Sequence, residues 1–139
     1  MKYLLDTCVI SELMKSNGND KVVTWIKNAK ENHLFISVLT IGEIHKGISK
    51  LPESQKKESL KSWVDNDLKK RFKGRVLEIT EDIATLWGEL QGKAEKDGKK
   101  MPVIDSLIAA TALKNNLTVV TANVKDIEHS GCKIINPWE

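Results

Sequence analysis

Three acidic residues occupy positions where the surrounding sequence is otherwise apolar. Asp6 ends a short apolar run and is followed by apolar residues at helical spacing. Asp105 lies in the apolar stretch 102–113, and Glu43 lies among the apolar and small residues of 39–48. A charge directed toward the packed side of a helix is energetically costly unless it is paired or bound. These three carboxylates are therefore the first candidates for chemistry.

The chemistry that such carboxylates support depends on whether they meet. If they converge, two like charges about 4 Å apart repel by roughly 4 kcal/mol at a surface-like dielectric, so a positive charge is needed between them. Oxygen-only ligands without histidine or cysteine are typical of Mg²⁺ or Mn²⁺ and not of zinc. Such an ion activates water and neutralises charge on a phosphoryl group. The pattern therefore indicates metal-assisted hydrolysis of a phosphodiester.

Simpler roles remain open for the same three residues. Asp6 is well placed to cap the helix that follows it. Asp105 and Glu43 could instead pair with lysines such as Lys46 or cap nearby backbone. Structural ion pairs perturb the pKa values of acids as strongly as catalytic arrangements do. Spacing alone does not decide between these roles.

The elements that must position the acids alternate along the chain. Apolar runs predict strands at 3–5, 34–36, 76–79, 118–121 and 133–135, and the segments between them have helical periodicity. Asn19, Ser37 and Thr80 are candidate helix caps, and Pro52 suits the first turn of a helix over 53–72. This alternation predicts an α/β fold, a three-layer α/β/α sandwich on a mostly parallel sheet, with residues 1–139 as one domain.

Composition narrows the classes of protein that fit. The chain has 139 residues and a formal net charge of +3. Cys8 and Cys132 lie far apart and form no CxxC pair, which is typical of free thiols in a reducing compartment and argues against structural zinc. No apolar stretch is long enough to span a bilayer, so we expect no membrane association and a cytoplasmic location.

Four segments together resemble one family. They are YLLDTCVISEL, SVLTIGEIHKGI, MPVIDSLIAATAL and LTVVTANVKDIEHSGCKIINPW. In this order and at these intervals the chain resembles the PIN-domain ribonucleases of the VapC toxin type. The resemblance implies a PIN-like α/β/α domain whose acids, here Asp6, Glu43 and Asp105, form a Mg²⁺- or Mn²⁺-binding pocket that cuts structured RNA such as tRNA or rRNA. It also implies a homodimer and a cognate VapB-type antitoxin.

The sequence departs from the family pattern at its fourth acidic position. Asn123 stands there, and its carbonyl oxygen still has the capacity to coordinate a metal or hold a water. Asp126, three residues later, offers a carboxylate, and Ala122 stands where an arginine is common. Asn123 is the feature that favours the alternative interpretation, a catalytically inactive PIN-like module that binds RNA or protein.

Other residues have supporting roles in this hypothesis. The hydroxyl groups of Thr7, Ser106 and Thr121 are candidates for orienting metal ligands, although capping is the simpler role for Thr7. The candidate residues for contacts to an RNA backbone are the basic residues Lys99, Lys100, Lys70 and Arg71. A solvated helix face is the plainer explanation for such charges elsewhere in the chain.

Overall fold

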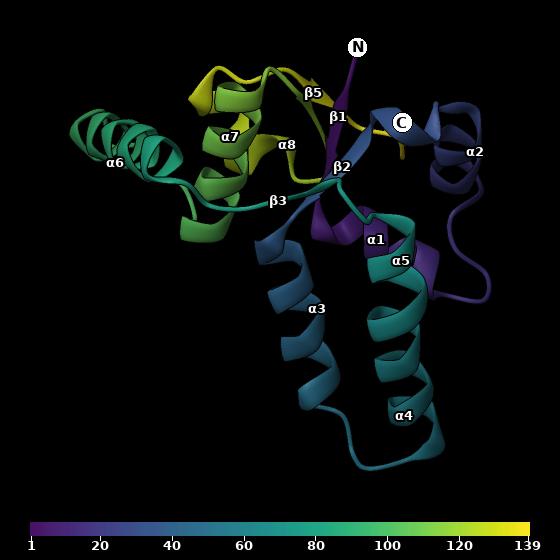
Figure 1. Ribbon diagram of the computed structural model, residues 1–139. Helices are drawn as coiled ribbons and strands as arrows, with labels where there is room; N and C mark the ends of the chain where they lie inside the picture. The colour runs from purple at the N-terminus through teal and green to yellow at the C-terminus, as the bar shows by residue number, and fades with distance from the viewer.

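A five-stranded parallel sheet forms the centre of the molecule. The computed structural model describes residues 1–139, and the strand order is β3-β2-β1-β4-β5 with every neighbouring pair parallel (Figure 1). The strands are β1 (Tyr3–Leu5), β2 (Leu34–Ser37), β3 (Val76–Leu77), β4 (Thr118–Val120) and β5 (Ile134–Ile135). Because all five strands run the same way, their carboxyl ends share one edge of the sheet. The predicted α/β fold is confirmed.

Helices connect the strands, and several begin where the sequence predicts. The helices are α1 (Thr7–Met14), α2 (Asp20–Asn28), α3 (Val38–Ser49), α4 (Gln55–Ser62), α5 (Lys69–Arg71), α6 (Glu81–Lys96), α7 (Val103–Asn115) and α8 (Val124–Ile127). The side chains of Asn19, Ser37 and Thr80 accept hydrogen bonds from backbone N–H groups in the first turns of α2, α3 and α6. These three predicted caps are therefore confirmed. No helix is both long and apolar enough to cross a membrane.

The two faces of the sheet carry separate hydrophobic cores. Leu5 and Val120 point to the face covered by α1 to α4, whereas Leu4 and Val119 point to the face covered by α7 and α8. Successive residues of a strand alternate between faces, so each strand serves both cores. α6 packs on the outside of α7 (Figure 1). The predicted three layers are present.

The predicted helix over 53–72 is wrong in its details. Ser54, and not Pro52, begins α4, because the Ser54 hydroxyl accepts from the N–H of Lys57. The π-helical segment η2 (Trp63–Leu68) then separates α4 from α5. Figure 1 shows α3 and α4 side by side, projecting away from the sheet. The buried Lys57 ammonium joins them by donating to the carbonyl of Leu51, 3.1 Å away, near the end of α3.

Candidate functional site

Asp6 is held in place at the carboxyl edge of the sheet, between β1 and α1. Its side chain is buried, with the residue only 5% exposed. Oδ1 accepts from the N–H of Thr7 at 2.8 Å, which is the expected helix cap. Oδ2 accepts from the Thr121 hydroxyl at 2.7 Å. Thr121 directly follows the neighbouring strand β4, so two adjacent strand ends fix one carboxylate.

Thr7 links Glu43 to the same edge. The Thr7 hydroxyl donates to Glu43 Oε1 at 2.5 Å, and the hydroxyl oxygen of Thr40 lies 3.3 Å from it. Glu43 belongs to α3, which starts at the carboxyl end of β2. This contact therefore joins the helices that follow two neighbouring strands, and it leaves Oε2 of Glu43 without a hydrogen-bond partner in the protein.

Asp105 completes the acidic group from α7. Its pKa is raised to about 6, first by burial and then by the negative charges of Asp6, Asp126 and Glu43. The four carboxylates, which come from the start of α1 and from α3, α7 and α8, therefore influence one another electrostatically. The structure therefore places Asp6, Glu43 and Asp126 near enough to Asp105 to raise its pKa.

No basic side chain neutralises these carboxylates. None of the ion pairs in the structure includes any of the four acids, and Lys46 pairs with none of them. The alternative in which interior lysines balance Asp105 and Glu43 is therefore wrong. Instead, the acids keep their mutual repulsion, which is the arrangement expected where a cation is to be bound.

The donor set fits a hard divalent cation. Four carboxylates without a histidine offer only oxygen ligands, which suits Mg²⁺ or Mn²⁺. Burial raises the pKa of the nearby Cys8 thiol, with the charge of Asp6 adding to the effect, so the sulfur stays protonated at neutral pH and is a poor ligand. No three acidic, histidine or cysteine side chains stand close enough together to hold a metal as they are placed here. Binding would therefore have to draw the carboxylates inward.

Ser106 serves a different purpose from the one that the sequence indicates. Its hydroxyl donates to the carbonyl of Val103 at 2.8 Å and accepts from the indole N–H of Trp87 at 2.9 Å. The hydroxyl is therefore occupied between α6 and α7 and does not reach an acid. Trp87 of α6 thus anchors the first turn of α7, next to Asp105. A partly buried tryptophan still needs a hydrogen-bond partner for its indole N–H, and this requirement is the signal in the sequence that could have indicated the contact.

Asn123 lies at the rim of the acidic group. Its backbone N–H donates to the Thr121 hydroxyl at 2.9 Å, and the residue is exposed. Its side chain makes no hydrogen bond within the protein. Thr121 therefore connects the fourth family position with Asp6.

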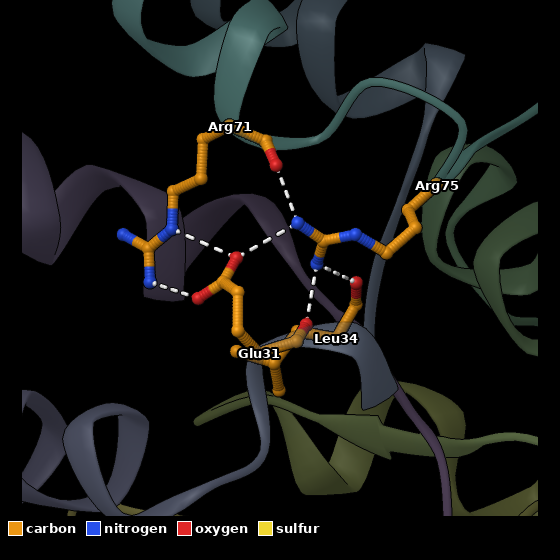
Figure 2. A network of polar contacts seen from close by, with 4 residues as sticks. All are labelled: Glu31, Leu34, Arg71 and Arg75. Atoms are coloured by element: carbon orange, nitrogen blue, oxygen red, sulfur yellow. Dashed lines mark hydrogen bonds and ion pairs between the residues drawn. The ribbon is translucent and has the colours of Figure 1, made fainter.

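The basic residues fall into two separate places. Lys99 and Lys100 line a hollow together with Asp126, and so lie on the same side as the acids. Arg71 instead forms a bidentate ion pair with the carboxylate of Glu31, with N···O distances of 2.9 and 3.1 Å. Arg75 donates to the same carboxylate (Figure 2). Arg71 lowers the pKa of Glu31 most strongly through this hydrogen bonding.

This ion-pair network lies at the opposite edge of the sheet. Glu31 precedes β2, whereas the acidic group follows the carboxyl ends of the strands. Arg75 also donates to the carbonyl oxygens of Glu31 and Leu34, so the network ties α5 to the start of β2 (Figure 2). The prediction that Arg71 contacts RNA beside the acids is not supported by this placement. Lys70, its neighbour in α5, does not line the hollow that Lys99 and Lys100 share with Asp126.

We expect Thr121→Val to weaken metal-dependent activity. The substitution keeps the shape of the side chain but removes the donor to Asp6, and loss of a partner that orients a metal ligand typically costs about tenfold or more in metal affinity. Titration of Mn²⁺ against activity measures this effect. Thr118→Val is the matched control, because Thr118 is a buried threonine of the adjoining strand β4 and its hydroxyl does not bind Asp6. Equal metal affinities for the two variants would contradict the role of Thr121.

Comparisons with known proteins find similar sequences and a similar fold over nearly the whole chain. The sequence pattern described as the PIN domain matches residues 3–129. The chain is 31% identical over 135 residues to the toxin FitB of Neisseria gonorrhoeae, covering 97% of each chain. It is 32% identical over 136 residues to the VapC ribonuclease Y4jK of Sinorhizobium fredii, covering 98% of this chain and 97% of the relative. A structure of FitAB bound to an IR36 DNA fragment superposes with a TM-score of 0.93 at 30% identity, covering 99% of this chain and 96% of the other.

Proposed function

The chain belongs to the PIN-domain family, and from that premise we propose that it is an endoribonuclease toxin of a toxin-antitoxin pair, restrained by a VapB-type antitoxin. Relatives named as a VapC ribonuclease and as the toxin FitB match nearly its whole length. The observation that carries the proposal is the group of four carboxylates at the carboxyl edge of the sheet, which no basic side chain neutralises.

The proposed reaction is hydrolysis of a phosphodiester bond with Mg²⁺ or Mn²⁺ as cofactor. Asp6, Glu43 and Asp105 would hold the ion, which when bound supplies an activated water and neutralises charge on the phosphoryl group. Thr121 and the N–H of Thr7 hold the Asp6 carboxylate in one orientation. The Thr7 hydroxyl holds Oε1 of Glu43 and leaves Oε2 without a hydrogen-bond partner in the protein. These partners limit the movement that is needed to collect the ligands.

We further propose that the substrate is structured RNA such as tRNA or rRNA, and that the chain acts in the cytoplasm as a homodimer. The antitoxin proposal is supported by the FitAB assembly, which contains a protein similar to this chain. A groove lined by apolar residues of α1, α3 and α4 adjoins Thr7 and Glu43 and would suit a segment of that partner.

One rival function has a specific observation in its favour. Asn123 stands in place of a fourth acid, which fits an inactive module that binds RNA or protein without cutting it. Asp126, however, lies close enough to Asp105 to raise its pKa, and so a fourth negative charge is present from another position. This favours the active enzyme.

The proposal is tested by expressing the chain alone and as Asp6→Asn in a cell that lacks the antitoxin. We expect the unmodified chain to arrest growth and to cleave RNA in a Mn²⁺-dependent, EDTA-sensitive way, because the carboxylates require a cation to act together. Asp6→Asn should do neither, and Asp20→Asn, an exposed acid at the start of α2, should behave as the unmodified chain. Equal growth arrest by the unmodified chain and by Asp6→Asn would overturn the proposal. Cleavage that survives EDTA would overturn it as well.

A further inference from the structure

A hollow of about 310 Å³ lies beside the acidic group, between the loop 97–102 and the segment formed by α8 and η3 (Glu128–Ser130). Three lysines from two separate stretches of the chain line it, Lys99 and Lys100 from the loop and Lys125 from α8. Asp126, Glu128 and His129 also line it. The hollow thus gathers positive charge that the sequence gives no reason to associate.

The loop that carries two of the lysines has a defined backbone. α6 ends at Lys96, and Gly98, two residues later, has a φ of +68°, the left-handed conformation that glycine adopts without strain. The N–H of Lys99 then donates to the carbonyl of Ala94 at 2.8 Å, which closes the end of the helix. Farther along, the buried side chain of Gln91 donates to the carbonyl of Met101 at 3.0 Å. Both lysines therefore extend from an anchored base.

The two walls of the hollow are joined to each other. His129 Nε2 on η3 lies 3.7 Å from Asp97 Oδ2, at the beginning of the loop. Ile127, between Lys125 and His129, is buried in the core that α7 and α8 share. This arrangement keeps Lys125 opposite Lys99 and Lys100.

The three ammonium groups have no carboxylate partners. None of them forms an ion pair, although Asp126 and Glu128 line the same hollow, whereas Lys57 and Lys69 elsewhere do form ion pairs. Unpaired lysines that converge from two walls favour a ligand with several negative charges. Lysine contacts phosphates as a point charge and carries no preference for base sequence.

The hollow is next to the proposed reaction centre. Asp126 lines it and also raises the pKa of Asp105, so one residue borders both places. Asp105 follows the loop after only two residues of α7. A nucleic-acid strand whose scissile phosphate lies at the acids would therefore bring its neighbouring phosphates to the lysines.

We propose that this hollow is a subsite for backbone phosphates of the RNA strand on one side of the scissile bond, with Lys99, Lys100 and Lys125 as the contacting residues. The inference rests on the proposed endoribonuclease function and adds to it a place for the substrate. Lys125 is not part of any run of basic residues in the sequence. Only the folded structure brings it to the same hollow as Lys99 and Lys100.

The test compares two double variants with equal loss of charge. One is Lys99→Gln with Lys125→Gln, and the control is Lys27→Gln with Lys30→Gln, two exposed and unpaired lysines at the end of α2, on the opposite layer. Binding to a fluorescent single-stranded RNA is measured in EDTA, where RNA integrity is checked on a gel, over a range of salt concentrations. The logarithm of the affinity falls linearly with the logarithm of the salt concentration, and each phosphate contact that is lost reduces the magnitude of this slope by about 0.7.

We expect the hollow variant to reduce the magnitude of this slope by about 1.4 and the control to leave it unchanged. In cleavage assays with Mn²⁺, the hollow variant should raise KM and leave kcat close to that of the unmodified chain. Equal slopes for the two double variants, or no RNA binding by the unmodified chain, would overturn the subsite. RNA binding with the expected slopes but without metal-dependent cleavage by the unmodified chain would instead overturn the enzyme function and leave the subsite standing.

Discussion

Asp105→Asn is expected to abolish RNA cleavage and, in the absence of metal at neutral pH, to make the protein more stable. The metal ion in such a site contributes several kcal/mol of transition-state stabilisation, and each 1.36 kcal/mol is worth tenfold in rate. Loss of a ligand should therefore lower kcat by at least about a hundredfold. The same substitution should raise the stability of the folded protein, because the charge of Asp105 that it removes is destabilising when no cation is bound.

The sign of the stability effect follows from the pKa of Asp105. Burial and neighbouring negative charges raise it from 3.8 to about 6 in the folded protein. The ionised form is therefore penalised above pH 6, the penalty falls as the pH drops through 6, and it is gone below 3.8. A shift of this size corresponds to about 3 kcal/mol for a fully buried group, but Asp105 is only partly buried and solvent screening reduces the effect to about 1 kcal/mol.

Thermal unfolding with and without Mn²⁺ measures this effect. In EDTA at pH 7.5, Asp105→Asn should raise Tm by about 4 °C, and the difference should disappear near pH 4. Saturating Mn²⁺ should reverse the order, since a metal that binds only the folded state stabilises the unmodified chain. Asp82→Asn is the control, because Asp82 is an exposed acid in the first turn of α6. Losing its favourable interaction with the helix dipole should lower Tm slightly. An Asp105→Asn protein that loses stability in EDTA as Asp82→Asn does would contradict the argument.

The residues that define local structure were largely predictable from the sequence. Asn19, Ser37 and Thr80 cap helices as expected because a cap depends only on a side chain and the three residues after it. Asp6 was placed at the end of a strand for the same local reason. The start of α4 was misplaced because Pro52 and Ser54 are both good starting residues, and only contacts between α4 and the end of α3 decide between them.

The site residues that could not be predicted from the sequence are those whose roles depend on contacts between residues far apart in the chain. Arg71 was grouped with the basic residues near the acids, but its partner Glu31 lies 40 residues away in the chain and holds it at the far edge of the sheet. Ser106 appeared free to orient Asp105 until Trp87 was found to use its hydroxyl. The sequence offers Asp126 as a substitute for a fourth acid, but only the packing of α8 against α7 brings its charge near Asp105.

We expect the affinity for metal to fall steeply as the pH is lowered. The fall should begin at a higher pH than it would for an aspartate with an ordinary pKa. Asp105 must lose its proton before it can act as a ligand, and its pKa of about 6 means that the proton is retained below that pH. The apparent affinity for Mn²⁺ should be nearly constant above pH 7 and should drop about tenfold for each pH unit below 6. Calorimetric titration of Mn²⁺ between pH 5 and pH 8 measures the midpoint.

Asp126→Asn separates the causes of this shift. It removes one of the negative charges that raise the pKa of Asp105 but leaves burial, the first cause, in place. The midpoint should therefore move to lower pH while staying above 3.8, the ordinary value for the group. Asp82→Asn should leave the midpoint unchanged, since Asp82 does not contribute to the shift. A midpoint near 4 in the unmodified chain would mean that Asp105 is separated from the other acids, and the shared metal site would then lose its physical basis.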